Sequence, residues 1–493
     1  MPDLSARTPA DRTPVHLDDV ERAALARAFE SGPSLFSLLS TLRTRRMGLG
    51  YRSETGEAET FDWSSGLTLA QPEGALPYES PAAPVPLTEV ESALLAWAAM
   101  GPNGVVCADI GVQSALSGLL SWAGRTIPGS SNDQSVDLFV IDDGGVSLYR
   151  PAPTRGAPLE IAGPDDYAKI LRWYRDDRIQ VSDRRPDIGW FSAPEGTHNV
   201  NAMGPGQYNL NRPGSTWLLP VGDVGREWFN LLLSSYEWSG FYLMDPDTAK
   251  PCGVDEWIRP GFLEVGFPVP VFDELALLMH ASQAAAAVQN VRLACEAMGL
   301  GAWPVGSYAD DMLLGAYPDV ARGLGFEFLE RDADANPAKT ATCTGLPGVF
   351  EPVVVPSPRF PTAADAVRYV KEARYARGGP LGTDGEFAHD AHGPYTSEAM
   401  REILEHPKAH IPDWVEAAAI QTVEYIVAKY GCCPAYVSPV RAKYSVQVHH
   451  TDIEYYRRFQ APLDGHPYAM TPQITGHFPT WHPGEADPSG GVQ

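Results

Sequence analysis

The sequence has few basic residues, few cysteines and no long apolar run. Lys and Arg number 37 against 62 Asp and Glu, which gives a formal net charge of −25. Because this charge repels nucleic acids and anionic membranes, we expect neither as a partner. No apolar stretch is long enough to span a bilayer, and the first residues lack the apolar core of a signal peptide. We therefore expect a cytoplasmic protein that acts on a small-molecule substrate.

The few cysteines are scattered, at Cys107, Cys252, Cys295, Cys343, Cys432 and Cys433. They are too sparse for a disulfide scaffold and form no paired CxxC zinc pattern. The vicinal pair could be redox-active, but ordinary thiols of a reducing compartment are the simpler interpretation.

The length of 493 residues and the 44% hydrophobic content allow a large core. We expect a tail and one helix in 1–33, and a main domain in 34–350 with an insertion at about 151–270. Residues 351–493 are expected to form a helical extension. It is rich in histidine, because nine of the twelve histidines lie beyond residue 385.

Two capping patterns predict helix starts, Asp18 with Glu21 and Thr88 with Glu91. The segment 34–46 predicts a second helix that ends in arginines. Segments 135–141 and 146–150 predict two strands joined by a turn.

A long helix is expected from residue 273 to residue 298. An apolar stripe follows one face, and polar residues, including Glu296, follow the opposite face. Gly299 and Gly301 predict its end. On periodicity alone, this is an ordinary core helix with a glycine stop.

The amino-acid sequence of this helix resembles that of the characteristic helix of the nitroreductase-like FMN enzymes. The matching residues are Gln289, Asn290, Leu293, Ala294, Glu296, Ala297, Gly299, Leu300 and Gly301. In that family the loop after the helix passes beside the flavin ring and turns backbone N–H groups towards it. The resemblance implies this role for Gly301, Pro304, Val305, Gly306 and Ser307.

A flavin phosphate is a dianion, which forked arginine donors suit. Arg43, Arg45 and Arg46 lie where the family carries an R-R-S-x-R-like element, and the resemblance implies that they bind the phosphate. Met47 replaces the usual Ser, and Leu49 stands where a basic residue is expected. The alternative is a basic helix end stabilised by the helix dipole.

The segment GRTIPGSSN, with the hairpin after it, resembles the azoline-dehydrogenase branch of the same family. The resemblance implies that Arg125, Pro128, Ser130, Ser131 and Asn132 approach the flavin. The usual Ser-Ala-Gly is here Gly-Ser-Ser, a departure that bears on cofactor binding.

Together the three segments predict an α+β, nitroreductase-like fold with a central, mainly antiparallel sheet flanked by helices. The implied activity is that of an FMN-dependent oxidoreductase with ping-pong transfer, from NAD(P)H or an organic donor to a small organic acceptor or O2. The chain is expected to be a homodimer or a single-chain pseudo-dimer. The rival is a protein that binds or sequesters flavin without turnover. We identify no catalytic acid or base.

The histidines offer a further alternative, a metal-binding protein. On a strand, His449 and His450 would point to opposite faces, so only His450 and Asp452 could share an ion. Two ligands are too few, and other histidines would have to converge, from among His389, His392, His477 and His482. We therefore expect no metal ligands.

Overall fold

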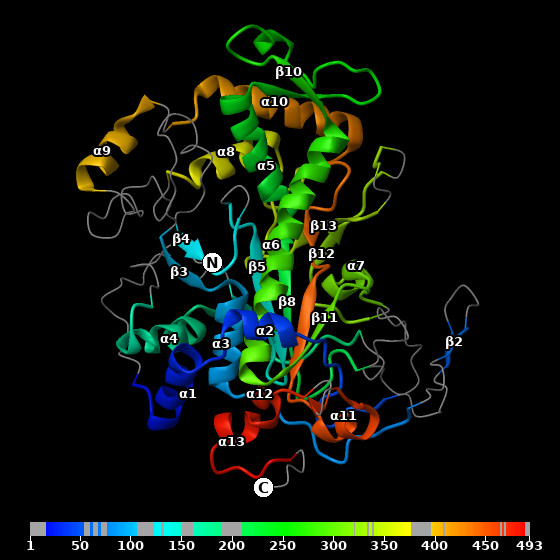
Figure 1. Cartoon of the computed structure of the whole chain (residues 1–493). Coiled ribbons are helices and arrows are strands. Elements are labelled where there is room, and N and C mark those ends of the chain that lie inside the picture. Colours follow the sequence, from blue (N-terminus) through cyan, green and yellow to red (C-terminus); the bar gives the residue numbers. More distant parts are fainter. Residues whose placement is uncertain are drawn as a thin grey trace.

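Figure 1 shows the computed structural model of the chain. The structure describes residues 16–53, 60–62, 68–70, 76–105, 123–129, 133–149, 161–188, 209–319, 321–332, 335–337, 340–375, 396–407, 410–463, 466–467 and 470–488. Within this part of the chain, no helix is both long and apolar enough to cross a membrane.

A seven-stranded sheet forms the centre of the molecule. Its order is β11-β15-β8-β5-β6-β7, with β14 also paired to β8, and each pairing is antiparallel. The bounds are β5 Val136–Asp142, β6 Gly145–Tyr149, β7 Arg178–Ser182, β8 Thr216–Asp223, β11 Gly301–Val305, β14 Val440–Arg441 and β15 Ser445–His449. The expected mixture of helices and sheet is therefore present.

Small two-stranded sheets surround this centre. Antiparallel pairs are β1 (Thr60–Asp62) with β2 (Thr68–Ala70), β3 (Pro102–Val105) with β4 (Ala123–Arg125), β12 (Glu327–Leu329) with β13 (Thr342–Gly345), and β16 (Pro462–Leu463) with β17 (His466–Pro467). A parallel pair joins β9 (Phe241–Met244) to β10 (Val265–Pro268).

Both faces of the central sheet are buried, because side chains that alternate along each strand enter two different cores. On one face, strand residues such as Leu138 and Val446 pack with α1 (Asp19–Glu30), α3 (Glu89–Met100), α4 (Ala168–Asp176) and the second half of α6 (Val269–Met298). On the other face, Phe139 and Trp217 pack with α7 (Asp310–Leu314) and the segments around β12 and β13.

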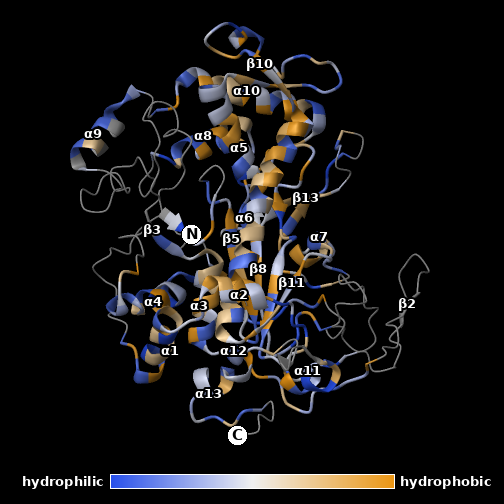
Figure 2. Ribbon diagram, viewed as in Figure 1, coloured by the Kyte–Doolittle hydropathy of each residue, from blue (hydrophilic) through white to orange (hydrophobic). Residues whose placement is uncertain are grey.

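The 30-residue helix α6 runs through the middle of the molecule, from the region of β10 to that of α12 (Figure 1). Its first half packs with α5 (Val224–Ser234), α8 (Ala363–Glu372) and α10 (Asp413–Tyr430), which make a separate helical core. Figure 2 shows hydrophobic residues gathered along these packed helices and strands. Helix α9 (Ser397–Glu405) lies at the side of this region (Figure 1).

The C-terminal segment returns to the opposite end of α6. It contains α11 (Ile453–Phe459), α12 (Pro472–Thr475) and α13 (His477–Trp481). Gly299 ends α6 with φ 82°, and a Cβ there would lie 2.1 Å from the carbonyl oxygen of Gln473. Only glycine suits both the left-handed backbone and this close approach. The residue that ends α6 therefore also allows α12 to pack closely against it.

The second expected helix is shorter than predicted. Helix α2 (Leu35–Thr41) ends before the arginines, and Leu42 is extended. The Thr41 hydroxyl donates back to the Ser37 carbonyl, and the Arg45 N–H donates to the carbonyl of Ala302 in β11. Arg45 therefore lies along the sheet edge, whereas Arg43 directly follows the end of the helix.

Two inner strands of the central sheet come from the segments expected as an insertion and as an extension. Strand β8, from the supposed insertion, lies between β5 and β15, and β15, from the supposed extension, lies between β8 and β11. Both strands are inner strands of the main sheet. The described parts of 151–270 and 351–493 are therefore integral to one fold.

Candidate functional site

Glu91, in the first turn of α3, has two tasks. Its Oε2 accepts hydrogen bonds from the backbone N–H of Thr88 (2.7 Å) and from the Thr88 hydroxyl (2.9 Å), which completes the predicted capping box. The carboxylate is fully buried. The cap fixes its orientation, and Oε1 is left facing the interior of the molecule.

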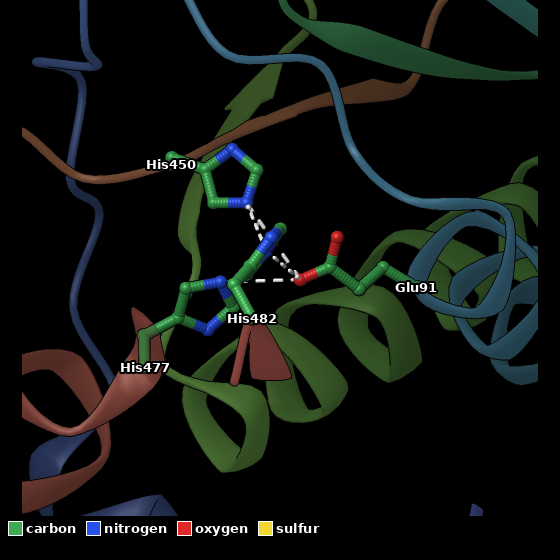
Figure 3. A group of neighbouring side chains, drawn as sticks. All are labelled: Glu91, His450, His477 and His482. Carbon is green, nitrogen blue, oxygen red and sulfur yellow. Dashed lines mark hydrogen bonds and ion pairs between the residues drawn. The ribbon is translucent and has the colours of Figure 1, made fainter. Parts of the chain in front are cut away.

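Three histidines meet that oxygen. His450 follows β15, His477 begins α13, and His482 follows the end of the same helix. Their Nε2 atoms lie 3.7, 3.1 and 3.2 Å from Glu91 Oε1, and the Nε2 atoms of His450 and His482 are 3.2 Å apart. Figure 3 shows the three rings pointing towards one carboxylate oxygen. All four side chains are buried, and we call them the His3Glu cluster.

Each imidazole is oriented by an oxygen on its far side. The Nδ1 of His450 lies 2.9 Å from the carbonyl oxygen of Val85, and that of His477 lies 2.7 Å from the carbonyl oxygen of Met298. The Nδ1 of His482 lies 3.4 Å from the Glu485 carboxylate. These oxygens only accept, so they orient each ring with its Nδ1 towards an acceptor and its Nε2 towards Glu91.

The cluster shifts the pKa values of its members. Burial alone would raise the pKa of Glu91, but hydrogen bonds with the three histidines hold it well below its usual range. Burial lowers the pKa of His477. For His482, burial is outweighed by the Glu91 carboxylate, and the pKa is raised. The site is thus built around an ionised carboxylate.

The other prominent histidine points away from this cluster. His449 lies on the opposite face of β15, as the alternation of a strand predicts, and its ring is packed against Gly48 and Gly301. A Cβ on either glycine would come within 2.6 Å of the ring. Asp452 is also elsewhere: it caps α11 and accepts a hydrogen bond from Tyr78. His389 and His392 lie outside the described residues.

The predicted phosphate ligands are placed very differently from one another. Arg45 is buried and forms an ion pair with Glu296, with Nη1 2.6 Å from Oε2. Arg46 is exposed, and its guanidinium lies 4.0 Å from the centre of the Trp303 ring. Arg43 is half-buried. Glu296, expected on the polar face of its helix, is instead the buried partner of an arginine.

The segment expected as a flavin-facing loop is largely a strand. Gly301–Val305 form β11 and pair with β15, and Pro304 has no N–H to donate. Gly306 and Ser307 follow the strand, half-buried and exposed respectively. Pro128 is exposed, whereas Ser130, Ser131 and Asn132 lie outside the described residues.

The three predicted segments nevertheless meet along one helix. The Arg45 side chain contacts α6 at Glu296, and its backbone N–H donates to Ala302 of β11. The Asn290 amide of α6 donates to the Thr126 carbonyl at 2.7 Å, which brings up the 123–129 segment. Six residues, or about 9 Å of helix, separate these two contacts.

Sequence reasoning overlooked Glu91 as a functional residue. Its pattern was fully accounted for by the capping box, and nothing local signals a second role. The signal was weak: the helix EVESALLAWAAM is largely apolar, and two acidic residues, Glu89 and Glu91, lie in its first turn. The partner histidines come from segments more than 350 positions later.

No protein-family model matches this chain, and no curated protein sequence matches it. Among solved structures, the chain is similar to a protein from Ralstonia eutropha JMP134 that is provisionally named a nitroreductase. The sequences are 16% identical, the match covers 60% of this chain and 80% of that chain, and the TM-score is 0.25. A TM-score of this size does not establish a shared fold or family.

Proposed function

We propose that this chain is a flavin-dependent oxidoreductase of the nitroreductase type, with FMN bound beside the C-terminal half of α6. The observation that carries the proposal is the meeting of the three predicted segments. Segment 301–307 begins with β11 and directly follows α6, and the distant segments 43–47 and 123–129 contact α6 or β11 between Asn290 and Ala302. When bound, the flavin supplies the electron-transfer chemistry, and the chain must hold and shield it.

The fit of individual residues to FMN is uneven. Arg45 does not fit the phosphate role, because its charge is already matched by Glu296 in a buried pair. Arg46 fits better, since it is exposed and held over Trp303, from where a guanidinium can meet a dianion. Gly306 and Ser307 retain backbone N–H groups beyond the paired strand. We assign the phosphate to Arg46 and the edge of the flavin ring to 306–307.

The test begins with the visible absorption spectrum of the purified chain, followed by titration with FMN. A yellow protein, or one that takes up FMN, that is bleached by NAD(P)H without oxygen is the expected result. A flavoprotein inert to NAD(P)H would leave a substrate dehydrogenase that passes electrons to O2. A flavoprotein with no turnover on any electron donor would instead support the sequestering function.

Arg46→Ala should weaken FMN binding by about 10-fold or more, because a charge-assisted contact is lost. Arg259→Ala is the matched control: its guanidinium also lies over an aromatic ring, that of Phe262, at 4.2 Å, but far from the proposed site. A colourless chain that takes up no FMN would overturn the proposal. Equal FMN affinities of the two variants would overturn the assignment of Arg46.

A further inference from the structure

We propose that the His3Glu cluster is a binding site for one divalent transition-metal ion of the zinc type. In a tetrahedral site with ligands about 2.0–2.1 Å from zinc, neighbouring ligand atoms are about 3.3–3.4 Å apart. Four of the six ligand-to-ligand distances in the cluster are 3.1, 3.2, 3.2 and 3.7 Å, and all six are within 4.8 Å. These distances are close to those between the ligand atoms of one tetrahedral ion.

The arrangement of the four atoms suits a cation at this point. Each Nδ1 lies beside an oxygen, so all three Nε2 atoms face the same Glu91 oxygen and can offer their lone pairs to one ion. The Nε2 of His477 is buried and lies 3.1 Å from that oxygen. A divalent ion satisfies all four at once.

The contacts of the three Nδ1 atoms resemble those found around metal-binding histidines. Such histidines pass their other N–H to a carbonyl or a carboxylate, which fixes the tautomer and raises ligand basicity. Val85, Met298 and Glu485 provide these acceptors, and Thr88 orients the carboxylate. The ligands are therefore held in place before any ion arrives.

The donor set indicates which ion and what role. Three imidazoles and one carboxylate in a tetrahedral arrangement suit zinc, whereas calcium and magnesium prefer six or more oxygens. All four positions are taken by protein and all four residues are buried, which is typical of structural zinc and unlike a catalytic site with an open position. The ion would fasten α13 to α3 and to the end of β15.

The experiment measures metal content and metal uptake by the full chain. We expect one zinc ion per chain by elemental analysis. After chelation, Co²⁺ should bind with the intense visible absorption of a tetrahedral cobalt site, and Zn²⁺ should displace it. Failure of the chelated chain to bind either ion, or a pale cobalt complex with the weak absorption of six-coordinate cobalt, would overturn the proposal.

Variants separate this site from other histidines. His477→Gln and His482→Gln should each lower zinc affinity by at least ~100-fold, more than the loss caused by removing an outer-shell partner. His410→Gln is the matched control, because His410 is exposed and lies outside the cluster. Unchanged affinity in both cluster variants would overturn the site. If they fail to fold, the cobalt spectrum of the unmodified chain still decides, and neither measurement depends on flavin.

Discussion

At the scale of single residues, the chain buries charge in pairs. Arg45 and Glu296 are each at most 2% exposed, and they come from segments 251 positions apart. Removing one partner leaves the other charge buried and unmatched, which is much more costly than losing an exposed pair. This pair therefore fixes the 43–47 segment against α6, whatever that segment binds.

We expect Arg45→Met to lower the free energy of unfolding by about 3–5 kcal/mol, measured by chemical denaturation. The double variant Arg45→Met/Glu296→Leu should recover much of this loss, because no unpaired charge remains. Arg175→Ala is the control: its pairs with Glu21 and Glu89 are partly exposed, so the change should be within about 1 kcal/mol. A small effect of Arg45→Met would show that the pair is hydrated in solution.

The buried His280 should make the free energy of unfolding depend on pH, and a substitution can isolate its contribution. Burial, helped by Arg441 of β14 and opposed by Asp310 of α7, lowers the pKa of His280 to about 4. The unfolded chain binds this proton below about pH 6.5, and the folded chain does not. The folded state therefore keeps its full contribution above pH 6.5 and loses stability as the pH falls from about 6.5 to about 4.

The loss should approach ~1.4 kcal/mol for each pH unit in that window. His280→Gln, which cannot titrate, should flatten the dependence relative to the unmodified chain, measured as denaturation midpoints between pH 4 and pH 7. His410→Gln, an exposed histidine, should leave the slope unchanged. Equal slopes in all three proteins would contradict a neutral, buried His280.

At the scale of elements, helix caps connect local sequence to the proposed metal site. Thr88→Ala removes the hydroxyl that orients Glu91, so it should lower stability by about 1 kcal/mol and zinc affinity by about 10-fold. Thr362→Ala removes the same kind of cap from α8, where Thr362 pairs with Asp365. It should cost similar stability and leave zinc affinity unchanged, as measured by competition with a chelating dye. Equal affinities would show that the cap does not position the ligand.

The elements that could be predicted are those whose signals are local. Asp18 with Glu21 and Thr88 with Glu91 mark the starts of α1 and α3, and the turn at 143–144 joins β5 to β6 as expected. Helix α2 was overextended because its pattern continues past the point where Arg45 pairs with β11. The hydrogen bond from the Arg45 N–H to Ala302 takes the place of a helical one, and no pattern within 34–46 predicts that contact.

At the scale of the whole molecule, local sequence patterns do not indicate where distant segments meet. β8 and β15 occupy the middle of the sheet, but one lies in a Gly- and Pro-rich region and the other in a histidine-rich one. The first was therefore expected in an insertion within the main domain, and the second in a C-terminal extension. The proposed metal site could not be predicted for the same reason: the alternation along β15 separated His449 from His450 correctly, but Glu91, in α3, could not be matched to the histidines by spacing.

The position of β15 has a consequence for the order of synthesis. β8 and β11 are made first and must wait for Ser445–His449 before the sheet is continuous. His482 follows Glu91 by 391 positions, which corresponds to about 20–80 s of translation at 5–20 residues per second. Until β15 has been made, the edges of β8 and β11 that pair with it stay open to other chains. The ribosome-bound protein is thus most exposed to aggregation shortly before its last histidines emerge.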